Sequence, residues 1–198
     1  MTVGWRRIRR LERLGNSSMP QAISQFGRPI AAIGASPVPP DEFRAALSRL
    51  TTAVSVIATD GPAGVAGLTC SAVCAVSDDP AMVLACVHGK SAANAIIKAN
   101  GVLCVNCLQS GQRSLSQAFA GIGGLPMPER FALAQWSVLA TGAPYCKDAL
   151  LALDCKLADV RDIGTHSIFV GKVVATAEPA DGAPLVYQRR AYATTRAL

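Results

Sequence analysis

Along this sequence, short apolar runs alternate with polar turn residues, a pattern that predicts a protein built mainly from β-strands. Glycine, proline and aspartate separate the runs, as in Asp60–Gly64 and Asp79–Pro80, and these residues are typical of turns. Because strands and helices do not alternate regularly, the pattern favours a small Greek-key β-barrel of six or more strands. The predicted strands cover residues 52–59, 65–69, 73–76, 82–87, 102–108, 150–160, 167–177 and 185–187.

Three segments show the spacing of short helices instead. The first begins at Asp41, a good N-cap residue, and places Phe43, Leu47 and Leu50 on one face. The other two are expected at residues 91–98 and 112–120. We therefore predict one domain, residues 41–198, with a few short helices beside the barrel.

Size and composition agree with one well-packed domain. The chain has 198 residues, of which 51% are hydrophobic, so a sizeable core is expected. Its longest apolar run, residues 81–87, is too short to span a bilayer, and no membrane segment is expected. Seven cysteines without a secretory signal fit reduced thiols in a cytoplasmic protein better than a disulfide framework.

The positive charge is concentrated at the start of the chain. Residues 1–40 hold six arginines and one glutamate, whereas the remaining residues hold 13 basic and 12 acidic side chains. The domain therefore lacks the clustered basic residues that nucleic-acid binding requires. Glycine, serine, proline and alanine dominate residues 15–40, so residues 1–40 are expected to form a flexible basic tail. A targeting presequence and a true start at Met19 are the open alternatives.

The stretch Gly67–Pro80 carries the first chemical signal. It opens with the small or hydroxylated residues Gly67, Thr69, Ser71 and Ala72, and a phosphate binds well where backbone N–H groups are accessible and side chains are small. Local composition alone favours a simpler interpretation, which is a strand that runs into an ordinary turn.

No metal site or nucleophile is expected. Cys104 and Cys107 have CxxC spacing, but residues three apart on a strand face opposite sides, and only two histidines are present to complete a site. These cysteines, like Cys70 and Cys74, are expected to be buried structural residues. The chain also lacks a GxGxxG after a strand, a Walker loop and a GxSxG elbow.

A reaction carried by a cofactor needs binding and orientation more than an acid–base pair, and hydride transfer is the leading example. His166 lies in the predicted turn 162–166. On its own residues the chain leaves two roles open for His166, which are the orientation of a cofactor and the capping of a turn.

Several short motifs follow one another along the domain. They are F-R-A-A-L-S at 43–48, the stretch 67–80, V-N-C-L at 105–108, G-T-H at 164–166 and Y-Q-R-R-A-Y at 187–192. In this order they resemble one family, the short-chain flavin reductases, whose fold is the FMN-binding split β-barrel. Residues 119–136 are most similar to the reductase component of 4-hydroxyphenylacetate 3-monooxygenase, and residues 59–64 and 71–74 to the flavin reductase of pyrimidine degradation.

The resemblance implies reduction of FMN or FAD by NADH or NADPH, with reduced flavin supplied to a separate monooxygenase of the aromatic-hydroxylase type through weak or no contact. It also implies a homodimer and a catalytic contact between His166 and the nicotinamide. A corrinoid reductase of the same fold and a flavin- or haem-binding module without turnover are the alternatives. The implied flavin-binding residues are Thr69, Cys70, Ser71, Ala72, Lys90, Ser91, Asn94, Asn106, Arg189 and Tyr192.

Overall fold

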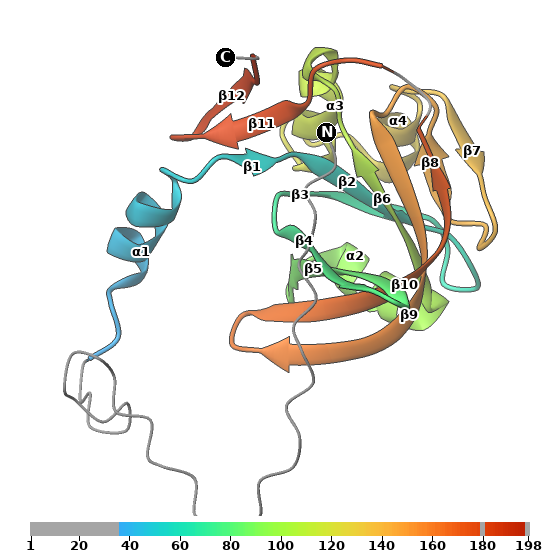
Figure 1. Cartoon of the computed structure of the whole chain (residues 1–198), viewed down its shortest axis with the longest axis horizontal. Helices are drawn as coiled ribbons and strands as arrows, with labels where there is room; N and C mark the ends of the chain where they lie inside the picture. Colours follow the sequence, from blue (N-terminus) through green and yellow to red (C-terminus); the bar gives the residue numbers. More distant parts are fainter. Residues whose placement is uncertain (1–35, 179–180, 197–198) are drawn as a thin grey trace, which may run out of the picture. The chain divides into compact units, whose positions relative to one another are not determined.

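The computed structural model describes residues 36–178 and 181–196 (Figure 1). The helices and strands that it describes lie in the unit Pro40–Leu198. The predicted flexible tail lies almost entirely outside the described residues. No helix among the described residues is long and apolar enough to cross a membrane.

A seven-stranded antiparallel sheet forms the body of the domain, in the order β3-β2-β6-β9-β10-β5-β4. Its edge strands β3 (Ala66–Cys70) and β4 (Val73–Asp78) are joined by Ser71 and Ala72 alone, so the sheet must curve back on itself. Among the described residues no ladder joins β3 to β4. The predicted antiparallel, mainly β fold is confirmed, and its barrel is open at this edge. The other strands are β2 (Ser55–Thr59), β5 (Ala81–His88), β6 (Val102–Cys107), β9 (Leu151–Ile163) and β10 (His166–Ala177).

Alternate side chains of these strands fill the main core. In β5, half-buried and buried residues alternate from Met82 to Val87, which is the period of a strand with one face inward. The helix α2 (Ala92–Asn100) adds Ala93 and Ile97 to this core. It begins after the N-cap Ser91 and ends where Gly101 adopts a left-handed φ of +70°, so the predicted helix is confirmed.

A second core lies around the helix α3 (Arg113–Phe119). The ring of Phe119 makes T-shaped contacts with Phe131 and Trp136, at centroid distances of 5.1 and 5.8 Å. These contacts hold the connection after α3, for which the sequence predicts no helix or strand. The structure adds the short elements α4 (Met127–Phe131), β7 (Trp136–Val138) and β8 (Pro144–Cys146), with a 3₁₀ turn, η2 (Ser110–Gln112), before α3.

The predicted strand 52–59 is divided between two sheets. The N–H of Val54 donates to the carbonyl of Leu185, and the carbonyl of Val54 accepts from the N–H of Leu108, each at 2.9 Å. The chain therefore changes sheet at Val54. The part before it, β1 (Thr52–Ala53), joins β11 (Leu185–Gln188) and β12 (Ala191–Thr194) in a three-stranded sheet.

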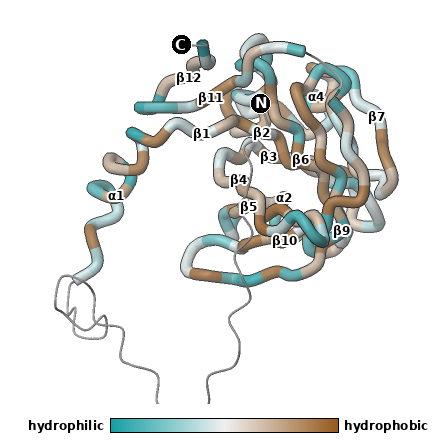
Figure 2. The backbone as a smooth tube through the Cα atoms, viewed as in Figure 1, coloured by the Kyte–Doolittle hydropathy of each residue, from teal (hydrophilic) through white to brown (hydrophobic). Residues whose placement is uncertain are grey.

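The helix α1 (Pro40–Leu47) confirms the first predicted helix, but none of its residues is buried. Figure 2 shows apolar and polar positions following each other along α1. Phe43 and Leu47 are 53% and 45% exposed. The apolar face of α1 is therefore uncovered by the described part of the chain.

All seven cysteines are free thiols. Cys104 packs with Ala143 and Ala152, and Cys107 lies against the main core, so the two face opposite sides as predicted. Burial raises the pKa of both thiols. Cys70 is buried too, but Cys74 is exposed, because the edge strand β4 buries neither face well. The prediction that Cys74 is buried is wrong.

Candidate functional site

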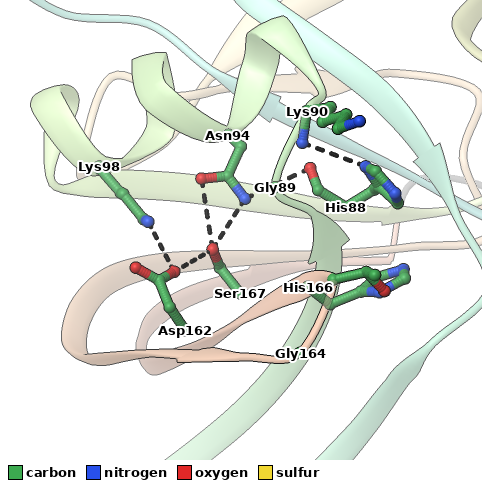
Figure 3. A pocket seen from close by; sticks show the side chains of 10 residues that line it. His88, Gly89, Lys90, Asn94, Lys98, Asp162, Gly164, His166 and Ser167 are labelled. Carbon is green, nitrogen blue, oxygen red and sulfur yellow. Dashed lines mark hydrogen bonds and ion pairs between the residues drawn. The ribbon is translucent and has the colours of Figure 1, made fainter.

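A cavity of about 430 Å³ lies where the end of β5, the first turns of α2 and the β9–β10 hairpin meet (Figure 3). We call it the histidine cavity, because both histidines of the chain line it. The hairpin turns tightly at Gly164, whose φ of +57° suits glycine. The lining residues are mostly of polar types and consist of residues 88–90, Asn94, Lys98, Asp162 and residues 164–167.

A hydrogen-bonded network fastens the hairpin to α2 on one side of this cavity. The amide Nδ2 of Asn94 donates to Ser167 Oγ at 2.9 Å, and Ser167 Oγ donates to Asp162 Oδ1 at 2.5 Å. Lys98 Nζ donates to the same carboxylate oxygen at 2.7 Å. The hydrogen bonds from Lys98 and Ser167 lower the pKa of Asp162. This network fixes the position of the hairpin relative to the helix.

Asn94 is committed to this network. Its side chain is only 3% exposed, and Nδ2 also donates to the carbonyl of Val87 at 3.3 Å. The predicted flavin contact of Asn94 therefore has no free amide N–H to draw on. The structure gives Asn94 a structural role instead, because a buried polar group that is already paired is costly to re-pair.

The two histidines lie on the other side of the cavity. His88 and His166 are directly opposite each other in the β5–β10 ladder. Their rings meet edge to face, with centroids 5.0 Å apart. The backbone N–H of Lys90 donates to His88 Nδ1 at 3.1 Å, and Thr165 Oγ1 lies 2.9 Å from His166 Nδ1. Both imidazoles are solvent-exposed and have defined neighbours.

A groove follows β3 and the link to β4. It consists of two hollows of about 250 Å³ each, which share Ala120, and we call it the β3 groove. One hollow is lined by Thr69, Ser71, Ser116 and Tyr192, among others. The other is lined by residues 67–68, residues 91–93, residues 119–121, Met127 and Arg130.

The second hollow of the β3 groove has features that suit an anion. Residues 91–93 bring the N-terminal end of α2 to the hollow, and Ser91 makes no side-chain cap hydrogen bond. Backbone N–H groups at a helix N-terminus favour negative charge. Arg130 Nε donates to the carbonyl of Leu125 at 2.7 Å, which fixes this guanidinium at the hollow. Of the side chains that line the β3 groove, Arg130 is the cationic one.

The first hollow is shaped by hydrogen bonds around Ser116. Thr69 Oγ1 donates to the Ser116 carbonyl at 2.6 Å, and the hydroxyls of Ser116 and Tyr192 lie 3.0 Å apart. The guanidinium carbon of Arg113 lies 5.6 Å from the centre of the Tyr192 ring. Thr69 and Tyr192 thus line the groove with their hydroxyls already paired.

The structure brings the expected site residues together in two groups. Thr69, Ser71, Ser91 and Tyr192 line the β3 groove, whereas Lys90, Asn94 and His166 line the histidine cavity. The two groups meet between Lys90 and Ser91, which are consecutive in the chain.

Ala72 and Cys70, two of the expected flavin-binding residues, can offer only backbone groups to the β3 groove. Ala72 is exposed, and its carbonyl accepts the N–H of Cys86 at 3.0 Å. The thiol of Cys70 is buried and its pKa is raised by that burial.

Arg189 is exposed in the β11–β12 turn with a φ of +49°, and it lines neither the groove nor the histidine cavity.

The expected contact of Asn106 with the flavin is not supported by its position in the structure. It is 0% exposed, Nδ2 donates to the carbonyl of Val56 at 3.1 Å, and Oδ1 accepts the N–H of Cys146 at 2.7 Å. Its amide ties β6 to β2 and β8 and presents no surface to a ligand. Asn106 is a structural residue, because its polar atoms are used by the main chain.

The sequence interpretation overlooked Arg130 and His88 as site residues. Arg130 belongs to the segment 119–136, which carried the family likeness without an assigned role. His88 lies just before Lys90 and Ser91, which are expected to bind the flavin, and only its residue type distinguishes it in the sequence. Its position opposite His166 depends on the β5–β10 register, which the sequence does not reveal.

Known proteins resemble this chain over nearly the whole described domain. The FMN reductase (NADH) RutF 2 of Rhizobium rhizogenes is 45% identical over 161 residues, which are 80% of this chain and 92% of the relative. A crystal structure of a candidate flavin reductase from Haemophilus somnus has a TM-score of 0.76 and 37% identity, and covers 80% of this chain and 100% of its own. BorF, the flavin reductase component of a bacterial two-component tryptophan halogenase, has a TM-score of 0.72 and 28% identity over 78% of this chain and 96% of its own. The flavin reductase like domain matches residues 47–196, and the chain belongs to this family.

Proposed function

We propose that this protein is an NADH-dependent FMN reductase. The name of the Rhizobium rhizogenes relative, FMN reductase (NADH), supports both substrates. In the proposed reaction a hydride leaves C4 of the nicotinamide and reduces the flavin, one proton is taken from water, and NAD⁺ and reduced flavin are released. FAD and NADPH are the alternative substrates.

The observation that carries this proposal is that consecutive residues line the histidine cavity and the β3 groove. Lys90 lines the histidine cavity and Ser91 lines the β3 groove, and consecutive Cα atoms are about 3.8 Å apart. Hydride transfer requires the donor and acceptor atoms to approach within about 3–3.5 Å. The proposal therefore requires the nicotinamide and the flavin to extend past this segment towards each other.

The residues present fit a flavin nucleotide in the β3 groove. Arg130 and the α2 N-terminus at Ser91 suit its phosphate, and the small residues of the β3–β4 link, Ser71 and Ala72, leave room for a close approach. A bound flavin would supply the hydride acceptor. The protein's own part is to bind, orient and hold the two substrates.

His166 is proposed to contact the nicotinamide nucleotide from the histidine cavity, with Lys90 beside it. Thr69 and Tyr192 are proposed to shape the flavin end of the site, with the main chain of Cys70 and Ala72. Arg189 is proposed to approach the site only when a ligand or partner is bound, because it lies outside both cavities here.

The assay mixes the purified protein with NADH and FMN and follows the loss of NADH absorbance. We expect rapid consumption with FMN and a rate that depends on both substrates. His166→Ala should raise the apparent KM for NADH while the Kd for FMN stays near that of the wild type. Absence of NADH consumption with FMN, FAD and riboflavin would refute the reductase and favour a binding module. NADH consumption only with a cobalt corrinoid would favour the alternative function, a corrinoid reductase.

Reduced flavin is proposed to pass to a separate monooxygenase with weak or no contact. BorF, as a reductase component of a two-component system, supports this arrangement. With the reductase and a flavin-dependent hydroxylase on opposite sides of a membrane permeable to flavin, hydroxylation should continue under oxygen exclusion on the reductase side. Hydroxylation only when the two proteins share a chamber would indicate direct transfer.

A homodimer is proposed on the basis of two exposed apolar surfaces. Phe43 and Leu47 are uncovered on α1, and Val76 is 50% exposed on the edge strand β4. Light scattering after gel filtration should give twice the chain mass. Phe43→Ser with Leu47→Ser should shift the mass towards one chain, and an unchanged mass would exclude α1 from the interface.

The domain boundary and the location are also proposals. Residues 41–198 are proposed as the catalytic domain and residues 1–40 as a dispensable tail, so a chain that begins at Val38 should reduce FMN at the full-length rate. The free state of all seven thiols supports a reducing compartment such as the cytoplasm.

A further inference from the structure

The two histidines of this chain form a pair, although they are 78 residues apart. His88 ends β5, His166 begins β10, and the antiparallel register places them directly opposite each other. Their rings meet at an interplanar angle of 76° with centroids 5.0 Å apart. This is the edge-to-face arrangement that aromatic rings prefer.

Each ring also has a fixed neighbour of its own. His88 Nδ1 accepts the backbone N–H of Lys90 at 3.1 Å, so in the neutral ring the proton is on Nε2. His166 Nδ1 lies 2.9 Å from Thr165 Oγ1. His88 is therefore oriented by the main chain, independently of His166.

The backbone under the pair is held firmly. The N–H of Gly89 donates to the carbonyl of Thr165 at 2.9 Å, just beyond the paired positions. The buried contact between Asn94 and Ser167 fastens α2 to β10 next to the pair. A side chain on such a scaffold can hold its neighbour in one orientation, whereas an exposed imidazole without such contacts would change rotamer freely.

We propose that His88 is a positioning residue, whose ring holds His166 in the orientation that meets the nicotinamide nucleotide. The proposal rests on the proposed role of His166 in coenzyme binding. His88 lines the same cavity but acts through His166, because its own Nδ1 is occupied by Lys90.

Two substitutions separate the ring of His88 from its hydrogen bond. His88→Asn keeps an acceptor near the position of Nδ1 for the Lys90 N–H but removes the ring. His88→Phe keeps a ring edge to face with His166 but removes the acceptor. We expect His88→Asn to raise the KM for NADH about twofold to tenfold, which is the factor that corresponds to the energy of one aromatic pair. His88→Phe should raise the KM for NADH less than His88→Asn does, because it restores the ring, and the Kd for FMN should be unchanged in both variants.

A double-mutant cycle tests whether His88 acts through His166. In the His166→Ala background, His88→Asn should cause no further rise in the KM for NADH. An equal rise in both backgrounds would overturn the proposal. A wild-type KM for NADH in His88→Asn alone would also overturn it, as would equal losses in the Asn and Phe variants.

A second measurement keeps this inference separate from the proposed function. The chain has two histidines, so selective isotope labelling gives two imidazole spin systems in an NMR spectrum. Relaxation of the His166 ring should report greater mobility in His88→Asn than in the wild type or in His88→Phe. Unchanged mobility would overturn the positioning role. A normal KM for NADH in His166→Ala, together with a His166 ring that becomes more mobile in His88→Asn, would refute only the coenzyme contact of His166.

Discussion

Gly67 offers the most direct test of how the β3 groove is built. A Cβ atom added at Gly67 would lie 2.6 Å from Cε1 and 2.9 Å from Cδ1 of Phe119. The Phe119 ring is 2% exposed and is held by Phe131 and Trp136, so it has little freedom to move away. Gly67→Ala therefore inserts a methyl group into a filled space.

We expect Gly67→Ala to lower the free energy of unfolding by about 1–3 kcal/mol, the usual cost of overpacking a core. For a domain of this size that corresponds to a fall in Tm of about 2–12 °C. Thermal unfolding followed by circular dichroism measures it. The matched control is Gly111→Ala, because a Cβ at Gly111 meets nothing within 4 Å.

The double variant Gly67→Ala with Phe119→Leu identifies the cause. Leucine lacks the ring atoms that clash, so the second substitution should cost less in the Gly67→Ala background than in the wild type. A Tm of Gly67→Ala equal to that of Gly111→Ala would refute the packing argument. The absence of a side chain at Gly67 would then be explained better by close approach of a ligand.

Three further predictions address charge and thiol chemistry. Arg130→Gln should raise the Kd for FMN about tenfold to a hundredfold, because a hydrogen bond to a charged group contributes about 1.5–3 kcal/mol. Riboflavin, which lacks the phosphate, should bind as before. Fluorescence quenching measures both affinities, Lys156→Gln is the control, and equal weakening for both flavins would contradict the prediction. Cys74 should be the one thiol that reacts rapidly with DTNB in the native protein, so Cys74→Ser should abolish the fast phase, and a persistent fast phase would place it on another cysteine. The lowered pKa of Asp162 contributes stability that is fully present above its unfolded-state pKa of about 4 and is lost as the pH falls through the folded-state value. Urea unfolding between neutral pH and pH 2 should therefore show a smaller loss of unfolding free energy for Asp162→Asn than for the wild type. Parallel pH dependence of the two proteins would contradict this prediction.

The strands that the sequence predicts well are those with one face in the main core. The strand β5 is a continuous apolar run from Ala81 to Val87, and such a run bounded by turn residues predicts a strand even though its burial alternates. The helix α2 carries its own start and stop signals at Ser91 and Gly101. Both signals are local, so the sequence alone reveals them.

The elements that the sequence misses depend on contacts made elsewhere. The strand β7 has three residues and the helix α4 has five, too few to show a period. They are held by the packing of Phe131 and Trp136 on Phe119. The break at Val54 likewise depends on distant contacts, because its N–H bonds to Leu185 and its carbonyl bonds to Leu108.

The candidate site shows a different limit. Asn94 and Asn106 are polar residues among apolar ones, and such a residue can bind a ligand or pair with buried main chain. In the structure both amides are used inside the protein. The side chains of Lys90 and Ser91 make no hydrogen bond to the described part of the chain and line the two cavities. Breaking a buried hydrogen bond to serve a ligand costs as much as the new bond returns, so the ligand is expected to use the unpaired groups. Strand register and side-chain packing decide which polar groups are already paired. Residue type alone therefore predicts the site only in part.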